Sequence, residues 1–356
     1  MATAGQDVRR MSTVPSKSLP PIAVTMGDPA GIGADIALAC WQKRNKDSLP
    51  PFVIVGDPQV LGTRAQALGL EVSIATVESP IEGFAVFCEA LGVIQAGSAG
   101  DISPGKPTAK GGAAAVASIE RAVALVQRGE ARAVVTNPIN KAQLYDVGFA
   151  YPGHTEFLAA LARNSTGNAV EPVMMLVCDE LKVVPATLHV ALKDVGSRLS
   201  RDLIGRTIAT TDKGLRSYFG IPSPRIAIAG LNPHAGEAGT MGREEIDIIA
   251  PAIQQARTAG IRASGPFSAD TMFHRNARQD YDAAVAMYHD QALIPIKTLA
   301  FERAVNLTLG LPFIRTSPDH GTAYDLAGTG KADPNSLSEA LKLADSIWLR
   351  LAAVKV

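Results

Sequence analysis

Short apolar runs with strand propensity alternate along this chain with amphipathic stretches of helical length. The strand-like runs are residues 22–25, 52–55, 133–136, 173–177, 183–188, 225–229 and 283–287. The helix-length stretches between several of them are residues 34–42, 112–128, 199–218 and 244–259. Because strands that alternate with helices are typical of a largely parallel sheet, the pattern predicts an α/β fold.

The charge balance excludes two classes of partner. Lys plus Arg number 34 and Asp plus Glu number 34, so the formal net charge is zero. A neutral chain lacks the attraction that draws proteins to nucleic acid or to an anionic membrane. No apolar run approaches the roughly 20 residues that cross a bilayer, and 47% of the residues are hydrophobic. We therefore expect a soluble globular protein, and its length suggests about two domains.

The cysteines and the N-terminal segment indicate a reducing compartment. Cys40, Cys88 and Cys178 are far apart and no CxxC pair occurs, so neither a disulfide framework nor a thiolate zinc site is expected. Residues 1–20 are polar and lack the apolar stretch of a secretory signal. The sequence therefore predicts a cytoplasmic protein with a flexible N-terminal tail over residues 1–20.

Two glycine-rich segments resemble phosphate-binding loops only in composition. GDPAGIG at 27–33 follows a strand-like run and opens a helical pattern, a place where backbone N–H groups can face an anion. It lacks the spacing of a Rossmann fingerprint and the Lys-Ser/Thr of a P-loop, so a tight strand-to-helix turn is the favoured interpretation. GKPTAKGG at 105–112 follows no strand-like run and is expected to be a surface loop.

Three of the six histidines share one setting, because His189, His234 and His289 each follow a strand-like apolar run. In open α/β sheets, ligands bind beyond the carboxyl ends of strands. Three neutral imidazoles that converge there could hold a divalent cation with positions open for substrate. Their spacing is not a metal signature, so three separately hydrogen-bonded histidines remain the favoured alternative from the pattern alone.

The other histidines differ in setting. His154 lies in a turn where Thr155 is expected to cap a helix, and either a ligand-facing ring or a part of the cap is consistent with the pattern. His320 lies in a loop where binding is plausible, and His274 lies in a polar stretch typical of a solvated surface.

Four polar residues lie in otherwise apolar segments, namely Asp270, Lys297, Asn306 and Arg315. A lone Lys or Arg in such a segment is most often a side chain that reaches out to solvent. If the two cations instead face a pocket, they suit a phosphorylated or carboxylated substrate.

Seven motifs follow one another in a recognisable order. They are VTNPINK at 135–141, YPGHTEF at 151–157, GLNPHAGEAGTMGREEID at 230–247, GPFSADTMF at 265–273, AMYHDQALIPIK at 286–297, VNLTLGLPFIRTSPDHGTA at 305–323 and AGTGKADP at 327–334. From about residue 21 to the C-terminus, the chain thus resembles the 4-hydroxythreonine-4-phosphate dehydrogenase family of the vitamin B6 pathway.

The resemblance implies an isocitrate/isopropylmalate dehydrogenase-like fold, in which two α/β/α domains flank an active-site cleft. The cofactor-side domain would comprise residues 21–145 plus 296–356, and residues 146–295 would form the domain on the metal, substrate and dimer side. A homodimer with a shared active site is implied. Residues 319–334 look like the adenosine-binding loop of decarboxylating dehydrogenases, which would explain a dinucleotide enzyme without a Rossmann fingerprint.

The resemblance also assigns roles to residues at matching positions. It implies one divalent cation (Zn, Mg or Co) that is held by His189, His234 and His289. One of these three ligands is expected to come from the partner subunit. The substrate-binding positions match His154, Thr155, Lys297, Asn306 and Arg315. The catalytic positions match Lys297, as a proton relay, and Asp270. Contacts to NAD(P)+ are expected from Asn232, His320, Gly321, Thr322 and Asp325.

The implied reaction is oxidation of 4-phosphooxy-L-threonine at C3 to 2-amino-3-oxo-4-phosphooxybutanoate. This product would decarboxylate to 3-amino-2-oxopropyl phosphate, a step in pyridoxine 5'-phosphate biosynthesis. Related dehydrogenases that act on 4-phospho-threonate or on a cyclic dihydrodiol are the alternative. A metal-dependent aldolase or hydrolase and a non-catalytic phosphoanion-binding protein are the remaining hypotheses.

Overall fold

The computed structural model describes residues 19–354, except 146–147, 149–150, 152 and 167–169. Residues 1–18 of the expected N-terminal tail lie outside the described part of the chain. None of the helices in this part is long and apolar enough to span a membrane.

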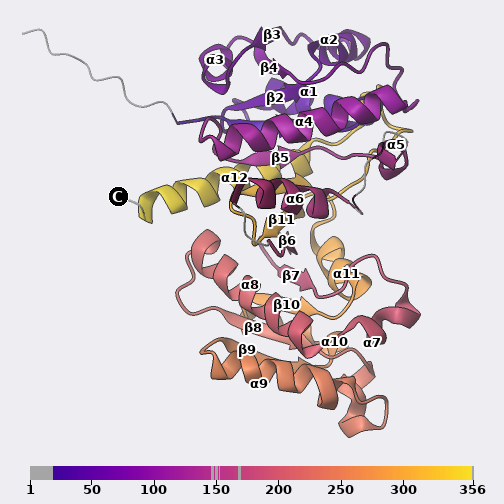
Figure 1. Cartoon of the computed structure of the whole chain (residues 1–356), viewed down its shortest axis with the longest axis vertical. Helices are drawn as coiled ribbons and strands as arrows, with labels where there is room; N and C mark the ends of the chain where they lie inside the picture. Colours follow the sequence, from indigo (N-terminus) through magenta and orange to yellow (C-terminus); the bar gives the residue numbers. More distant parts are fainter. Residues whose placement is uncertain (1–18, 146–147, 149–150, 152, 167–169, 355–356) are drawn as a thin grey trace, which may run out of the picture.

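One twisted sheet organises the molecule (Figure 1). Its order is β3-β4-β2-β1-β5-β12-β11-β6-β7-β10-β8-β9. The strands are β1 (Ile22–Thr25), β2 (Phe52–Gly56), β3 (Ile74–Val77), β4 (Leu91–Gln95), β5 (Val134–Thr136), β6 (Val173–Val177), β7 (Lys182–Pro185), β8 (Arg225–Ala229), β9 (Arg262–Phe267), β10 (Ala283–Ala286), β11 (Val305–Leu309) and β12 (Arg315–Pro318). Adjacent strands are parallel except where β11 meets β12 and β6, and where β6 meets β7. The expected α/β fold is thereby confirmed.

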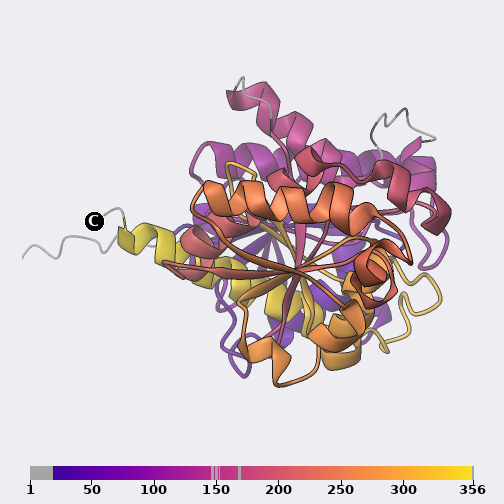
Figure 2. The ribbon, with the colours of Figure 1, turned by 90° about the horizontal axis from the view of Figure 1, so that it is seen from below.

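Helices cover both faces of the sheet (Figure 2). They are α1 (Gly33–Lys43), α2 (Pro58–Ala67), α3 (Pro80–Val86), α4 (Ala109–Gln127), α5 (Lys141–Tyr145), α6 (His154–Thr166), α7 (Val195–Arg198), α8 (Arg201–Phe219), α9 (Ala250–Thr258), α10 (Ala269–Met272), α11 (His289–Ala300) and α12 (Asn335–Val354). Short 3-10 or π segments are η1 (Leu192–Asp194), η2 (Pro233–Gly239), η3 (Glu245–Ile249) and η4 (Ala277–Gln279).

The two faces of the sheet are packed differently. On one face, apolar side chains of α1, α8, α9 and α12 share a single core that runs along the sheet. On the other face, one core lies under α4 and α6 and a second lies under α11. Successive strand residues point to opposite faces, so Leu307 joins the continuous core while Asn306 and Thr308 face the divided side. This divided face leaves room for a site at the centre of the sheet.

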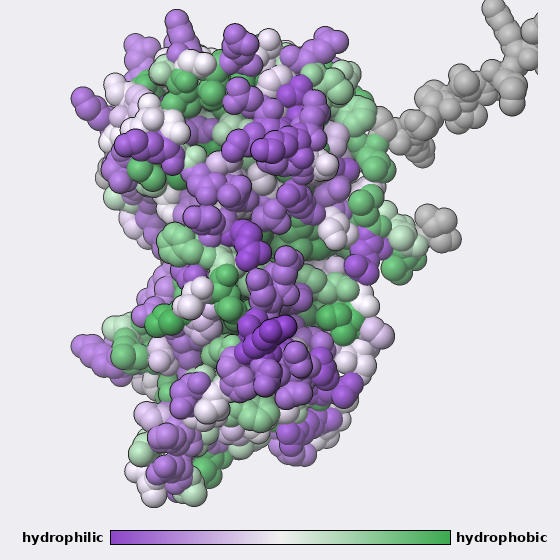
Figure 3. Space-filling model, turned by 180° about the vertical axis from the view of Figure 1, so that it is seen from behind, coloured by the Kyte–Doolittle hydropathy of each residue, from purple (hydrophilic) through white to green (hydrophobic). Residues whose placement is uncertain are grey.

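The outer surface follows the same division. Seen from the side opposite to Figure 1, hydrophilic side chains cover much of both ends of the molecule, which narrows between them (Figure 3). The described structure thus has two lobes joined by the central strands β11, β12 and β6.

Several expected elements are confirmed, and others are missed. The seven strand-like runs correspond to β1, β2, β5, β6, β7, β8 and β10. The sequence patterns do not predict β11 and β12, which lie within residues 305–318. They also do not predict α11, which continues through Pro295. The expected surface loop at 105–112 is wrong for its last four residues, because Ala109 begins α4 after Thr108 accepts a hydrogen bond from Gly111 N. Thr108 is therefore an N-cap that stabilises this helix start.

The GDPAGIG segment is a closed turn, as the sequence favours. The Asp28 carboxylate accepts from Ala30 N, while Gly31 N donates to Asp28 O and Ile32 N donates to Thr322 O. These N–H groups are satisfied by the protein and do not form an empty anion cradle. Tyr324 OH also donates to Asp28, so residues 322–324 lie directly on this turn.

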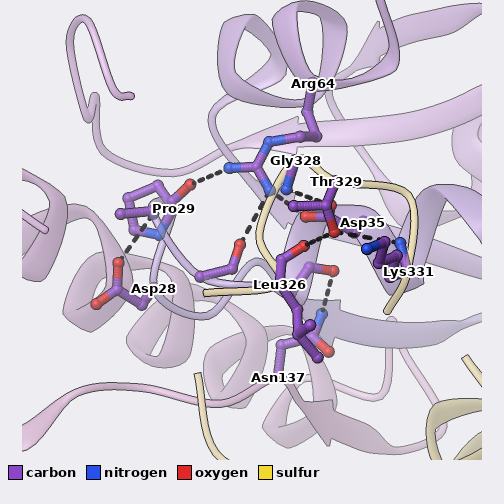
Figure 4. Close-up of polar contacts among 12 residues, drawn as sticks. Asp28, Pro29, Asp35, Arg64, Asn137, Leu326, Gly328, Thr329 and Lys331 are labelled. Atoms are coloured by element: carbon purple, nitrogen blue, oxygen red, sulfur yellow. Dashed lines mark hydrogen bonds and ion pairs between the residues drawn. The ribbon is translucent and has the colours of Figure 1, made fainter. Parts of the chain in front are cut away.

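A buried ion pair ties this turn to the C-terminal segment (Figure 4). Arg64 of α2 pairs with Asp35 of α1 and donates to the carbonyl oxygens of Pro29 and Gly31. The second carboxylate oxygen of Asp35 accepts from Gly328 N at 2.7 Å. Both side chains are almost fully buried, so each charge depends on the other for compensation.

We expect Arg64→Met to lower the free energy of unfolding by about 3–5 kcal/mol, because it leaves the Asp35 carboxylate buried without its cation. Urea unfolding of the variant and the unmodified protein measures the difference. Arg128→Met, which removes an exposed pair with Glu130, is the control and is expected to change stability by about 1 kcal/mol or less. Equal effects of the two substitutions would contradict the role of Arg64.

Candidate active site

A cavity of about 630 Å³ lies on the divided face, between the core under α6 and the core under α11. Its floor is made by neighbouring strands β5, β12, β11 and β6, which contribute Thr136, Arg315, Ser317, Asn306 and Met174. Its walls include Lys141, His154, Thr155, Glu156, His189, His289, Leu293, Lys297, Asp319, His320 and Gly321. Nine residues predicted from sequence therefore line one cavity, namely His154, Thr155, His189, His289, Lys297, Asn306, Arg315, His320 and Gly321.

Arg315 is a buried cation at the floor of this cavity, with 3% of its surface exposed. Its guanidinium donates to Thr136 Oγ1 at 2.6 Å and to Thr308 Oγ1 at 2.9 Å. No carboxylate among the described residues forms an ion pair with it. Burial lowers its pKa to about 10, but the side chain still carries its charge at neutral pH. A buried, uncompensated guanidinium is suited to an anionic ligand.

Polar atoms without partners lie around the same cavity. His154 Nε2, Asn306 Oδ1, His320 Nε2 and Asn137 Oδ1 are buried and have no hydrogen-bond partner among the described residues. Since a buried polar atom without a partner costs about 1–3 kcal/mol, their gathering here indicates a polar ligand. Burial, helped by the nearby charges of Arg315 and Lys141, holds the pKa of His154 well below its usual value, so its ring is neutral.

His154 starts α6, and Thr155 is the second residue of that helix. The expectation that Thr155 caps the helix is therefore not met, because it lies inside the first turn. Both residues instead line the cavity. Their position at the start of a helix gives them backbone N–H groups that lack intrahelical acceptors.

Two of the three predicted metal ligands meet in the cavity. Strands β7, β10 and β8 are adjacent and parallel, so their carboxyl ends lie at one edge of the sheet. The rings of His189 and His289 are 5.8 Å apart between centroids. Burial and the nearby Lys141 lower the pKa of His189, which favours the neutral form that binds metals. His289 Nδ1 lies 2.7 Å from Asp290 Oδ1, which leaves Nε2 for a ligand.

His234 does not join this pair within one subunit. It is exposed on η2, and no cluster of three metal-ligating side chains occurs among the described residues. Its backbone is left-handed (φ +52°), as are the four residues that follow, and His189 is left-handed too (φ +47°). Left-handed non-glycine residues are strained and cluster at functional sites.

Glu245, which the sequence analysis does not single out, braces the His234 loop. Its buried carboxylate accepts from Leu231 N at 2.7 Å, from Asn232 N at 2.8 Å and from Asn232 Nδ2 at 3.0 Å. A side chain at Gly236 would meet this carboxylate at 2.6 Å. These hydrogen bonds hold Asn232 within the loop, and it does not line the cavity that His320 lines.

Asp270 likewise lies outside the cavity. It is exposed on α10 and accepts a short hydrogen bond from Ser268 Oγ. Lys297 instead pairs with Asp319, whose carboxylate lies 3.1 Å from Nζ. Burial raises the pKa of Asp319, and the charge of Lys297 acts against this rise. Asp319 is a cavity residue that sequence reasoning missed, although it directly precedes the predicted His320.

The predicted cofactor segment begins at the cavity and leads away from it. His320 and Gly321 line the cavity, Thr322 contacts the GDPAGIG turn through its carbonyl, and Asp325 is exposed. Lys141 is a further cationic lining residue that the sequence analysis does not single out. Lys141 is the last residue of the VTNPINK motif and begins α5, after the short segment that follows β5.

Comparisons with known proteins place the chain in a family. Residues 48–344 match a family described as pyridoxal phosphate biosynthetic protein PdxA. A 4-hydroxythreonine-4-phosphate dehydrogenase of Bradyrhizobium diazoefficiens is 55% identical over 343 residues, which are 94% of this chain and 98% of that protein.

Solved structures extend the comparison. A 4-hydroxythreonine-4-phosphate dehydrogenase from Klebsiella pneumoniae is 40% identical, with a TM-score of 0.79 and coverage of 92% of this chain and 99% of that one. A terephthalate 1,2-cis-dihydrodiol dehydrogenase from Burkholderia xenovorans is 30% identical, with a TM-score of 0.61 and coverage of 92% and 97%. The family match and the high identity over almost the whole chain show that this protein belongs to the PdxA family.

Proposed function

We propose that the chain oxidises 4-phosphooxy-L-threonine at C3, with NAD(P)+ and a divalent cation, in the synthesis of pyridoxine 5'-phosphate. The product, 2-amino-3-oxo-4-phosphooxybutanoate, would decarboxylate to 3-amino-2-oxopropyl phosphate. The buried guanidinium of Arg315, which no described carboxylate compensates, carries this proposal because it requires an anionic ligand. The names of the relatives in Bradyrhizobium and Klebsiella support the choice of substrate.

The anionic ends of the substrate are assigned to the cavity floor and the start of α6. Arg315 binds the phosphate or the carboxylate through two parallel N–H groups. The unpartnered Nε2 of His154 can donate to the same anion, whereas the unpartnered Oδ1 of Asn306 accepts and therefore suits the hydroxyl or amine of the substrate. Thr155 contributes from the first turn of α6, where free N–H groups favour an anion.

The histidine pair fits a divalent cation, since His189 is neutral and the Asp290 carboxylate orients His289. When bound, such a cation would draw electron density from the C3 oxygen, and NAD(P)+ would accept the hydride. Lys297 can accept the proton of the C3 hydroxyl only as a neutral amine, so its ammonium group first passes a proton to Asp319. The raised pKa of Asp319 makes it a suitable acceptor for that proton.

A homodimer would complete the site. His234 and Asp270 are exposed, and exposed apolar side chains surround them, namely Met241, Ile246 and Phe267. Segment η2 packs against α10 and β9, so these residues share one side of the molecule. An apolar side that presents a histidine is suited to a second copy of the chain. His234 of one subunit would then join His189 and His289 of the other.

The finer architecture belongs to the same proposal. The isocitrate/isopropylmalate dehydrogenase-like arrangement would comprise one domain of residues 21–145 plus 296–356 and another of residues 146–295. The position of the cavity between two separate cores supports a cleft between domains. Residues 319–334 would hold the adenosine of NAD(P)+ beside the cavity, and the enzyme would work in the cytoplasm.

We expect reduced nicotinamide to form with 4-phosphooxy-L-threonine and a divalent cation, since the buried guanidinium of Arg315 suits a phosphorylated substrate. Absorbance at the reduced-nicotinamide band measures the rate with this substrate, 4-phospho-threonate and a cyclic dihydrodiol side by side. A higher kcat/KM for either alternative would replace the proposed substrate. Binding without reduction would indicate a non-catalytic phosphoanion-binding protein.

Arg315→Ala is expected to raise the KM for the phosphorylated substrate about 10–100-fold, because charge-assisted hydrogen bonds contribute about 1.5–3 kcal/mol each. Its effect on kcat is expected to be smaller. Arg303→Ala, which removes a cation from exposed pairs with Asp179 and Glu180, is the control and should leave KM unchanged. An unchanged KM for Arg315→Ala would show that the substrate binds elsewhere.

In a heterodimer of His234→Ala and His289→Ala subunits, about half of the activity per site is expected to return, since one of its two sites keeps all three histidines. Each variant alone should be inactive. Steady-state rates of purified heterodimers, carrying two different affinity tags, measure the rescue. Mixed His189→Ala and His289→Ala subunits are the control, because these two histidines lie in the same subunit. Failure of the first pair to recover activity would contradict a shared site.

A further inference from the structure

A buried glutamine links the segments that carry all three predicted metal ligands. Gln291 is the third residue of α11, two positions after His289. Its Oε1 accepts from Met287 N at 2.6 Å, and its Nε2 donates to Gly230 O at 2.8 Å. The first bond holds the junction between β10 and α11, and the second reaches the start of the loop that carries His234.

The same junction is bonded to the segment that carries His189. Met287 O accepts from Thr187 Oγ1 at 2.8 Å and from Thr187 N at 3.2 Å. Thr187 lies two residues before His189 and is buried. The backbone of Met287 is therefore the meeting point, because its N–H is held by Gln291 and its carbonyl by Thr187.

The geometry around Gln291 is unlike that of an ordinary helix cap. A glutamine at position N3 of a helix commonly accepts a hydrogen bond from the N-cap N–H. Gln291 instead accepts from Met287 N, one residue before the N-cap, and its amide N–H donates to Gly230 O in the loop after β8. That loop is strained, with five consecutive left-handed residues from His234 to Ala238. A strained loop keeps one shape only where its surroundings over-determine it. Glu245 braces it from η3, and Gln291 braces it from α11.

We propose that Gln291 is a positioning residue that holds the His234 loop in register with the strand ends that carry His189 and His289. This inference rests on the proposed cation site. The two active sites of the proposed dimer would then depend on each other. In each subunit, the Gln291 amide holds both the histidine pair of its own site and the loop whose His234 completes the site of the partner subunit. Partners that orient metal ligands typically change metal affinity 10–100-fold when they are substituted.

Two variants test the proposal on the assembled protein. Gln291→Met keeps the length of the side chain and removes both hydrogen bonds. Gln291→Glu keeps an acceptor for Met287 N but replaces the donor to Gly230 O by a carboxylate oxygen, which repels that carbonyl, so it remains informative if the first variant fails to fold. Thr211→Val is the matched control, because it removes one buried side-chain hydrogen bond within α8, away from the histidines.

Titration with Co2+, followed by its visible absorbance, measures the dissociation constant without reference to activity, and thermal unfolding without metal measures stability. We expect the Co2+ dissociation constant to rise 10-fold or more in Gln291→Glu, with Thr211→Val unchanged. A rise below 10-fold, whatever the change in melting temperature, would overturn the proposal and assign Gln291 a purely structural role. If the unmodified protein binds no Co2+, the cation site of the proposed function is wrong. If the unmodified protein binds Co2+ and the variants bind it equally well, only the role of Gln291 is wrong.

Discussion

The unequal packing of the two faces of the sheet is the constraint on which the rest of the structure depends. A continuous core under α1, α8, α9 and α12 makes the central strands a rigid floor. On the opposite face the cores under α6 and α11 do not meet. Side chains that alternate out of β11 and β12 on that face are polar, and β5 adds Thr136, so the gap between the cores becomes a polar cavity.

Electrostatics gives that cavity its chemical character. Arg315 is held by two threonine hydroxyls, which orient the guanidinium and leave its charge uncompensated. Burial keeps His154 and His189 neutral, and the neighbouring cations act in the same direction. The cavity thus combines a fixed positive charge with neutral imidazoles, which suits an anionic substrate beside a metal ion.

Residues 319–328 connect this cavity to the GDPAGIG turn and to α1. Asp319 holds Lys297 at the cavity, while Tyr324 and Gly328 bond to Asp28 and Asp35 on the GDPAGIG side. The buried Arg64–Asp35 pair therefore supports a segment that reaches the cavity. The same polar contacts of Asp28 and Asp35 therefore stabilise this part of the fold and position the predicted cofactor segment.

Local sequence patterns determined seven of the strands, the helices α1, α4, α8 and α9, and the setting of the histidines at strand ends, because apolar periodicity and strand-to-helix punctuation are local properties. Motif order further indicated the family and pointed to Arg315, Asn306 and Lys297. Patterns missed β3, β4 and β9, and they missed β11 and β12, whose polar positions interrupt the apolar run because they face the cavity. They also missed Asp319, Glu245 and Gln291, whose partners are distant in sequence.

Only the tertiary structure decided which predicted residues meet. It brings His189 and His289 together and leaves His234, Asn232 and Asp270 outside the cavity. The reason is physical: the order β7-β10-β8 sets which strand ends are neighbours, and the left-handed turn after β8 directs its histidine away from the cavity. A one-dimensional pattern carries residue types and spacings, whereas the pairing order of strands and the burial of single charges arise only when the whole chain packs.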